Sequence, residues 1–419
     1  MDSTPHRHSS VEEHRSVEEH RSVEAHRSAV KDLLKPLASS GRTERLPLLE
    51  ALGRALASDV HAPLDLPPFA NSQMDGFAIR TADLPPGGAE LRVAAPVPAG
   101  AGASILEPGT AVPIMTGAMM PAGADAVVPI ERAVPDSFPV PGADALVRLP
   151  ATVAGTFVRI AGSDVAAGQL ALSAGTHLGP GQLGLLAGLG MAEVEVHSPV
   201  TVLLITTGDE VVEPGLPLDP GKIYDANGTL LAASMRQAGL QVTRTGIATD
   251  DPRELQALLR KHSHGMDLIV STGGVSKGAY EVVRQAMEDR DVEFLHVAMQ
   301  PGGPQGIGTF DGVPFLGFPG NPVSCLVSFE MFLRPALTSL LGAPATRPLV
   351  KARLADPLTS PEGKHQVRRG TFLADGTVRL EGGPSSHLVH ALAHSNALVH
   401  IPEGTAALAE GAEVEVWIL

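Results

Sequence analysis

The sequence predicts a multidomain protein built around a doubly wound α/β domain, with β-rich domains on either side. Three observations lead to this prediction. The chain has 419 residues, enough for two to four domains at roughly 150 residues each. Strand-like and helix-like segments alternate between residues 200 and 341, as in parallel sheets covered on both faces. Segments 64–199 and 350–419 instead contain short β-type runs broken by proline and glycine.

The chain begins with a repeated hexapeptide, Ser-Val-Glu-Glu-His-Arg and a close variant, over residues 10–27. Six residues turn a helix by about 600°, so the repeated valines form no apolar stripe. Glu-to-Arg pairs three residues apart favour a solvated helix. The five histidines from His6 to His26 raise the alternative of metal capture, but their spacing puts successive rings on different faces. We expect a flexible arm over residues 1–28.

Two helices are expected before the α/β domain. Behind Pro47, the apolar residues Leu48, Leu49, Leu52, Ala55 and Leu56 fall at helical spacing, which predicts a packed helix. The small-residue segment 181–190 resembles a second helix. It is far shorter than the ~20 residues that span a bilayer, and we expect no transmembrane segment.

The elements of the α/β domain follow in order. Asp251 and Pro252 predict the N-cap and first turn of a helix that runs to Lys261. Further segments have the apolar pattern of buried strands or of helices. The expected strands are 200–206, 242–247 and 267–271, the other expected helices are 230–237 and 279–288, and the last part should form strands at 377–380, 397–401 and 413–418.

Composition argues against polyanionic partners. The chain has 31 Lys and Arg against 46 Asp and Glu, a net charge of −15, which repels nucleic-acid backbones and anionic membranes. Aromatic residues make up only 3%, too few for a base-stacking platform. Cys325 is the sole cysteine, so no intramolecular disulfide is possible, and the charged N-terminus is unlike a secretory signal. We expect a cytoplasmic protein without nucleic-acid or membrane partners.

Three loops of the α/β domain have the residues of a ligand site: 206–210, 271–278 and 318–324. Ligands of doubly wound sheets lie beyond the carboxyl ends of the strands, where these loops fall. Gly273, Gly274 and Gly278 surround Ser276 and Lys277, so backbone N–H groups there can approach a phosphate; a plain tight turn is the alternative. Carboxylates at the same edge suit Mg²⁺, which takes one or two of them plus phosphate oxygens, whereas Asp251 is better explained as a helix cap.

Several ordered motifs together resemble the MoeA/gephyrin E-domain family of molybdopterin molybdenumtransferases. The resemblance covers nearly the whole chain from about Val30. The motifs are PPFANSQMDGFA at 67–78, MTGA at 115–118, TGDE at 207–210, IYDAN at 223–227, STGGVS at 271–276 and GFPGNPVS at 317–324.

The resemblance implies an elongated homodimer of four-domain subunits. Family members transfer molybdate to the dithiolene of adenylylated molybdopterin and release AMP, using Mg²⁺. The rivals are a molybdopterin-binding carrier and an adenylyltransferase. The implied domains are a split domain I (29–62 and 160–198), an inserted β domain II (63–159), the α/β molybdopterin-binding domain III (199–342) and a C-terminal β-barrel-like domain IV (343–419).

Site residues are implied by matching motif. Asp75 and Thr116 belong to loops that face the site from the N-terminal domains of the partner subunit. Glu210, Asp250 and Glu281 match acidic positions around the phosphates and the metal, and with Asp75 and Thr116 they form the expected catalytic set. The expected binding residues for molybdopterin and molybdate are Gly208, Asp209, Gly273, Gly274, Ser276, Lys277, Gln300, Pro319, Asn321, Arg369 (or Arg368) and Ser386.

The sequence departs from the family at three positions. Many members carry lysines where this chain has His296, Gln300 and Gly303, so up to three positive charges are missing beside a dianionic substrate. Charges of this kind are worth a few kcal/mol each at an effective dielectric of ~20. We expect Lys277 to compensate in part for this deficit.

Overall fold

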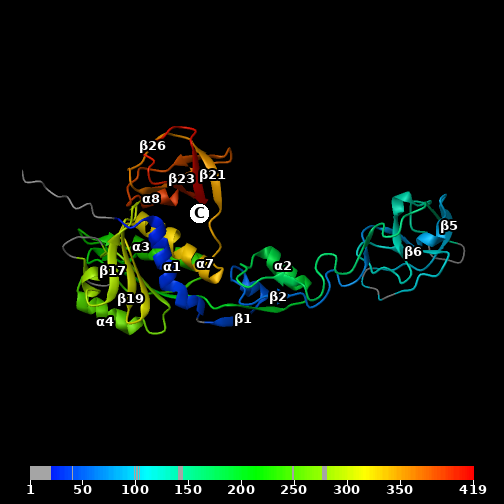
Figure 1. Ribbon diagram of the computed structural model, residues 1–419, viewed down its shortest axis with the longest axis horizontal. Coiled ribbons are helices and arrows are strands. Elements are labelled where there is room, and N and C mark those ends of the chain that lie inside the picture. The colour runs from blue at the N-terminus through cyan, green and yellow to red at the C-terminus, as the bar shows by residue number, and fades with distance from the viewer. Residues whose placement is uncertain are drawn as a thin grey trace, which may run out of the picture. The chain divides into compact units, whose positions relative to one another are not determined.

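The computed structural model describes residues 20–39, 41–98, 100, 102, 104–139, 145–247, 250–275 and 281–419 (Figure 1). Its contacts divide these residues into two compact units. Unit 1 holds the residues up to Thr43, the short stretch Gly53–Ala55 and His197–Leu419, and unit 2 holds Glu44–Leu52 and Leu56–Val196.

Unit 1 contains a six-stranded sheet. Its spatial order is β15 (Gln241–Arg244), β12 (Thr201–Thr206), β16 (Leu268–Thr272), β20 (Val313–Phe318), β19 (Pro304–Phe310) and β17 (Asp291–His296). Strands β15, β12, β16 and β20 pair in parallel, as predicted. The prediction is wrong for β19, which is antiparallel to both neighbours. Asp311 and Gly312, with φ of 47° and 85°, form the tight turn that makes β19 and β20 a hairpin.

Helices cover both faces of this sheet, which confirms the doubly wound arrangement. Val202 and Leu204 pack in one core with α1, α3, α6, η4 and α7. Leu203 and Ile205 point to the other face and pack with α4 and α5. The bounds are α1 Val23–Ser39, α3 Ala226–Gln237, α4 Pro252–His262, α5 Val282–Ala286, α6 Pro322–Ser328, the π-helix η4 Phe329–Leu333 and α7 Arg334–Leu341.

The prediction of a flexible arm over residues 1–28 is wrong for its last residues, because helix α1 begins at Val23. The third hexapeptide runs directly into α1, which lies beside α7 in Figure 1. His26 is 1% exposed, and Val30 and Leu34 are fully buried; these three residues, four apart, form the apolar face that the repeated valines do not. Arg21 also bonds through its backbone to His296 O and Ala298 N, at 2.9 Å each. Residues 20–28 are therefore ordered, and the arm's first 19 residues lie outside the described part of the chain.

The helix expected behind Pro47 is also wrong. Only the 3-10 turn η1 (Leu48–Ala51) forms. Leu49 and Leu52 are 86% and 55% exposed, so they make no packed stripe. Gly53, with φ of 78°, leaves helical geometry, and Leu56 instead forms an antiparallel bridge with Val196. The other helix predicted in this region does form, as α2 (Pro180–Gly188).

Unit 2 is otherwise built from short strands. A five-stranded sheet has the order β7 (Ala126–Pro129), β4 (Gly76–Ile79), β6 (Thr110–Ile114), β5 (Ala89–Val93) and β8 (Leu146–Leu149). Small two-stranded sheets pair β1 (Thr43–Pro47) with β11 (Glu193–His197), β2 (Val60–His61) with β10 (Leu170–Leu172), and β3 (Asn71–Ser72) with β9 (Val158–Arg159). The single turns η2 (Thr81–Asp83) and η3 (Ile130–Arg132) connect strands of the larger sheet.

The C-terminal part of unit 1 is a closed, barrel-like sheet. Its order is β18 (Met299–Gln300), β23 (His365–Phe372), β24 (Thr377–Leu380), β21 (Leu349–Leu354), β27 (Glu413–Ile418) and β25 (Ala397–Ile401). Closure comes from an additional pairing of β23 with β25. The remaining elements of unit 1 are β22 (Leu358–Thr359) with β26 (Ala407–Leu408), β13 (Val211–Val212) with β14 (Ile223–Tyr224), and α8 (Val389–Ala393).

Among the described residues, one helical stretch is long and apolar enough to cross a membrane by length and composition, Pro322–Leu341. Its apolar window is 78% buried, and it contains the charged residues Glu330 and Arg334. These features are those of a core helix.

Candidate functional site

A cavity of about 590 Å³ opens at the carboxyl edge of the unit 1 sheet. It is formed by the loops after β12, β16 and β20, together with the first turn of α3. This is where a doubly wound sheet is expected to bind its ligand. The lining residues are Thr206, Thr207, Gly208, Glu210, Val211, Ile223, Tyr224, Asp225, Ala226, Asn227, Asp250, Gly273, Gly274, Val275, Glu281, Gly320, Asn321, Pro322 and His387.

The glycines of the cavity wall are required by their conformation and by close packing. Gly273 and Gly274 have φ of 93° and 65°. A Cβ on Gly274 would lie 2.8 Å from Val283 Cγ2, and one on Gly273 would lie 3.0 Å from the backbone oxygen of Thr207. The N–H of Gly273 donates to Phe318 O at 3.1 Å. This glycine therefore shapes the wall, but its N–H is already bonded within the fold.

Glu210, Asp250 and Glu281 all line the cavity. Asp209, predicted beside them, is not among the lining residues. Its Oδ1 accepts from Asp250 N at 3.0 Å, while Asp209 N donates to Asp250 Oδ2 at 3.2 Å. These reciprocal bonds join the loop after β12 to the segment before α4. Asp251 caps α4, accepting from the N–H groups of Arg253 and Glu254, as predicted.

The predicted metal site of three carboxylates is not preformed. Within the ranges that the structure describes, no group of three or more His, Cys, Asp or Glu side chains is placed to hold a metal ion. The sequence placed Glu210, Asp250 and Glu281 at one edge of the sheet, but sharing an edge does not bring all three carboxylates within coordination distance of one ion.

The loop after β20 presents Asn321 to the cavity. Asn321 occupies the N-cap position of α6, but its side chain makes no capping bond. Pro319, predicted to bind substrate, does not line the cavity. Its carbonyl accepts from Thr272 Oγ1 at 3.2 Å and from Cys325 Sγ at 2.7 Å. Burial raises the pKa of the Cys325 thiol to about 12, so this cysteine supplies no thiolate.

The predicted residues of the last domain, Arg369 and Ser386, bond within the fold and do not line the cavity. Arg369 is 2% exposed and donates to the carbonyls of Ser385 and Gly383, at 3.2 and 2.5 Å. Burial, with the charge of Arg368, lowers its pKa. Ser386 accepts from Val323 N at 3.0 Å. Neither residue lines the cavity, but the same loop brings His387 to it.

Gln300 also lies outside the cavity lining. Its Oε1 accepts from Gln366 Nε2 at 2.6 Å, within the closed sheet where β18 pairs with β23. Ser276 and Lys277, the two polar residues predicted in the glycine loop, lie outside the described residues.

Asp75 and Thr116 belong to unit 2. The backbone N and the Oγ1 of Thr116 donate to Asp75 Oδ1, at 2.7 and 2.8 Å. These bonds, the backbone one first, lower the pKa of the Asp75 carboxyl. Both residues are exposed, so the pair is a preorganised carboxylate on the surface of that unit.

Several polar lining residues were not individually assigned a role from the sequence, among them Thr206, Thr207, Asp225 and Asn227. A usable signal exists for Asp225 and Asn227, because an Asx residue at a helix start beside a sheet edge is placed to face the ligand site.

Comparison with known proteins identifies the family. The chain is 44% identical over 388 residues to molybdopterin molybdenumtransferase 2 of Mycobacterium tuberculosis, covering 89% of this chain and 94% of that protein. This protein belongs to the MoeA family. Family models match along it in order: the MoeA N-terminal region (domain I and II) at 16–190, the probable molybdopterin binding domain at 203–339, and the MoeA C-terminal region (domain IV) at 351–419.

Other MoeA relatives agree with this assignment. The molybdopterin molybdenumtransferase of a Nostoc species is 35% identical, over 92% of this chain and 91% of its own. Among solved structures, the molybdopterin biosynthesis MoeA protein of Pyrococcus horikoshii superposes with a TM-score of 0.82 at 28% identity, covering 96% of this chain and 100% of that chain. The MoeA fold predicted from the motifs is confirmed.

Proposed function

We propose that this MoeA-family protein, which acts in molybdenum cofactor biosynthesis, transfers molybdenum from molybdate to adenylylated molybdopterin with release of AMP. The observation that carries the proposal is the polar cavity at the carboxyl edge of the sheet, which combines glycine turns with Glu210, Asp250 and Glu281. The names of the Mycobacterium and Nostoc relatives support the same activity.

The residues of the cavity suit an anionic substrate that arrives with a cation. The hydroxyl of Thr207 and the side-chain amide of Asn321 can donate to phosphate and molybdate oxygens. The carboxylates can orient an attacking water at the adenylate phosphorus. The water oxygen then bonds to that phosphorus to give AMP, the phosphoanhydride bond breaks, and the terminal phosphate of molybdopterin is the leaving group.

Mg²⁺ fits the donor set of this cavity. The acidic side chains that line it are oxygen ligands, and Mg²⁺ is usually held by one or two carboxylates with substrate phosphates and waters completing the shell. The lack of a preformed three-carboxylate cage among the described residues agrees with that arrangement. Glu210 and Asp250 would supply the protein's ligands. The ion, when bound, neutralises charge on the phosphates.

We also infer a cytoplasmic homodimer in which Asp75 and Thr116 of the partner subunit complete the site. The support is their exposed and preorganised geometry on unit 2, together with the motif resemblance. The domain boundaries implied by that resemblance, with domain I split around domain II, are part of the same proposal.

The test is AMP release by the purified protein from adenylylated molybdopterin, with Mg²⁺ and molybdate present. Glu210→Ala should lose AMP release by at least a hundredfold while retaining pterin binding. Glu288→Ala, on an exposed turn, is the matched control and should behave as wild type. Tight pterin binding by the wild type without AMP release would instead identify a carrier, and consumption of ATP an adenylyltransferase.

A further inference from the structure

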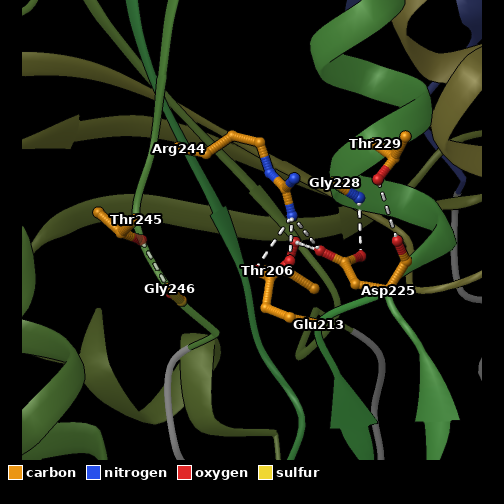
Figure 2. A network of polar contacts seen from close by, with 8 residues as sticks. All are labelled: Thr206, Glu213, Asp225, Gly228, Thr229, Arg244, Thr245 and Gly246. Carbon is orange, nitrogen blue, oxygen red and sulfur yellow. Dashed lines mark hydrogen bonds and ion pairs between the residues drawn. The ribbon is translucent and has the colours of Figure 1, made fainter. Parts of the chain in front are cut away.

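We propose that Arg244 is a positioning residue for the cavity and acts through the buried carboxylate of Asp225. The activity readout of this proposal rests on the proposed function. Figure 2 shows Arg244 reaching from the end of β15 towards Asp225 and Glu213. Arg244 itself does not line the cavity, whereas Asp225 does.

Asp225 joins three elements at one point. Its Oδ1 accepts from Gly228 N at 2.8 Å and caps α3. Its Oδ2 accepts from Thr206 Oγ1, at the end of β12, at 3.0 Å and from the Arg244 guanidinium at 2.8 Å. The Asp225 side chain is only 1% exposed. A carboxylate so enclosed requires a charged partner, and Arg244 provides it.

The packing around this carboxylate leaves no room for a side chain at position 228. A Cβ on Gly228 would lie 2.3 Å from Asp225 Oδ2, 2.8 Å from Thr206 Oγ1 and 2.9 Å from the Arg244 guanidinium. The guanidinium therefore occupies the space beside the first turn of α3. Its other partner is Glu213, at 3.3 Å from both carboxylate oxygens, which fixes the segment after β13.

The network extends to the opposite wall of the cavity. Asn227, in the same first turn of α3, donates from Nδ2 to Gly320 O at 2.6 Å. Gly320 lies in the loop after β20, next to Asn321. Arg244 thus holds Asp225, Asp225 holds the first turn of α3, and that turn holds the loop across the cavity. Loss of Arg244 should shift groups on both walls that contact substrate.

The experiment is a double-mutant cycle of Arg244→Met and Asp225→Asn, with adenylylated molybdopterin as the probe. Arg244→Met should raise the KM for the probe at least fivefold and change kcat less than twofold. In the Asp225→Asn background the same change should alter KM less than twofold, because the carboxylate through which it acts is gone. Arg244→Lys, which keeps the charge, should restore part of the loss.

A second readout follows the first turn of α3 without substrate. Hydrogen exchange of peptides covering residues 225–237 should be at least tenfold faster in Arg244→Met than in wild type. Arg236→Met is the matched control. It removes an exposed arginine of α3 whose side chain, among the described residues, hydrogen-bonds only to Val242 O, at 3.4 Å. It should change neither KM nor exchange.

The outcomes separate the possibilities. Additive effects of Arg244→Met and Asp225→Asn on KM would mean that Arg244 contacts substrate directly. A lowered kcat with unchanged KM and unchanged hydrogen exchange would mean only that less of the protein is folded. Either result overturns the proposal. If the wild type releases no AMP, the proposed function fails. The equilibrium Kd for the probe then replaces KM, and the exchange rates decide the role of Arg244 on their own.

Discussion

Lowering the pH from 7 to 5 should destabilise unit 1 through two buried histidines. His26 of α1 is 1% exposed and packs against Phe332, with ring centroids 4.6 Å apart. His400 of β25 is 6% exposed and packs against Trp417, with centroids 4.3 Å apart. Burial is the main cause that lowers the pKa of each to about 3, and neighbouring positive charge adds to it.

The size of the effect follows from linkage. An unfolded histidine takes up its proton as the pH falls through 6.5, whereas His26 and His400 remain neutral in the folded state until about pH 3. Their stabilisation is therefore complete above pH 6.5 and is lost progressively as the pH falls towards 3. At pH 5, which is 1.5 below 6.5, the loss is about 1.5 × 1.36, or about 2 kcal/mol for each histidine and about 4 kcal/mol for both.

Urea unfolding followed by tryptophan fluorescence measures this loss. Trp417 is the chain's single tryptophan, so the signal reports on unit 1. His26 and His400 should lower the wild-type free energy of unfolding by about 4 kcal/mol between pH 7 and 5. His365, which lies 3.1 Å from His400 and whose pKa burial also lowers, adds to this loss. Hydrogen bonds from Thr377 hold the pKa of the Asp375 carboxyl below its ordinary value of 3.8. Carboxyls of this kind stay ionised between pH 5 and 7 and add little to the loss of stability.

Variants assign the loss to the individual histidine. His26→Leu should reduce the difference by about 2 kcal/mol and cost little at pH 7, because the buried Nδ1 of His26 has no hydrogen-bond partner within the ranges that the structure describes. His264→Gln removes an exposed histidine and should leave the difference unchanged. A wild-type loss below about 1 kcal/mol, or a loss in His26→Leu equal to that of the wild type, would refute the reasoning.

Three further substitutions test the core, the cavity wall and unit 2. Glu330 is fully buried between Arg334 and Arg347, at 2.8 and 2.7 Å, so Glu330→Ala should cost about 3–5 kcal/mol in the same urea experiment. Gly274→Ala adds a Cβ at 2.8 Å from Val283 Cγ2 and should weaken binding of adenylylated molybdopterin at least tenfold. Gly265→Ala is the control, because Gly265 has φ of 78° and open space around its Cβ position. It should cost only about 1–2 kcal/mol of backbone strain and leave binding unchanged. Asp75→Ala frees the Thr116 donors and should lower AMP release at least tenfold without moving the Trp417 unfolding midpoint.

The sequence predicted the fold best where periodicity and burial agree. Strands β12 and β16 are continuous apolar runs because both their faces are covered, and Asp251 marked the start of α4 because its carboxylate satisfies free N–H groups there. The reversal of β19 was missed because residues 304–310 carry little apolar pattern, although Asp311-Gly312 is itself a hairpin signal. The face of α1 was missed because it includes His26, whose burial depends on Phe332, 306 residues further along the chain.

The candidate site shows a different limit. Strand order places Glu210, Asp250 and Asn321 at one edge, so the loops of the cavity were predictable from the sequence. A polar side chain can face the ligand or bond to other groups within the fold. Which of the two it does depends on tertiary hydrogen bonds that a local sequence pattern does not predict. Arg369 and Gln300 were predicted to bind substrate, yet their bonds run to the Gly383–Ser385 carbonyls and to Gln366.

Three positively charged side chains near the cavity already bond to other groups of the protein. Lys222 Nζ donates to Asp209 O at 2.6 Å, Arg244 pairs with Asp225 and Glu213, and Arg369 is buried against carbonyls. In these contacts, the partner of each positive group is a carboxylate or a backbone carbonyl of the protein. A dianion entering a cavity lined by Glu210, Asp250 and Glu281 would meet repulsion that its own hydrogen bonds do not offset. The family that the motifs resemble has lysines in many members where this chain has His296, Gln300 and Gly303. We therefore expect the compensating charge to come from Lys277 and from a cation that enters with the substrate and binds to the carboxylates.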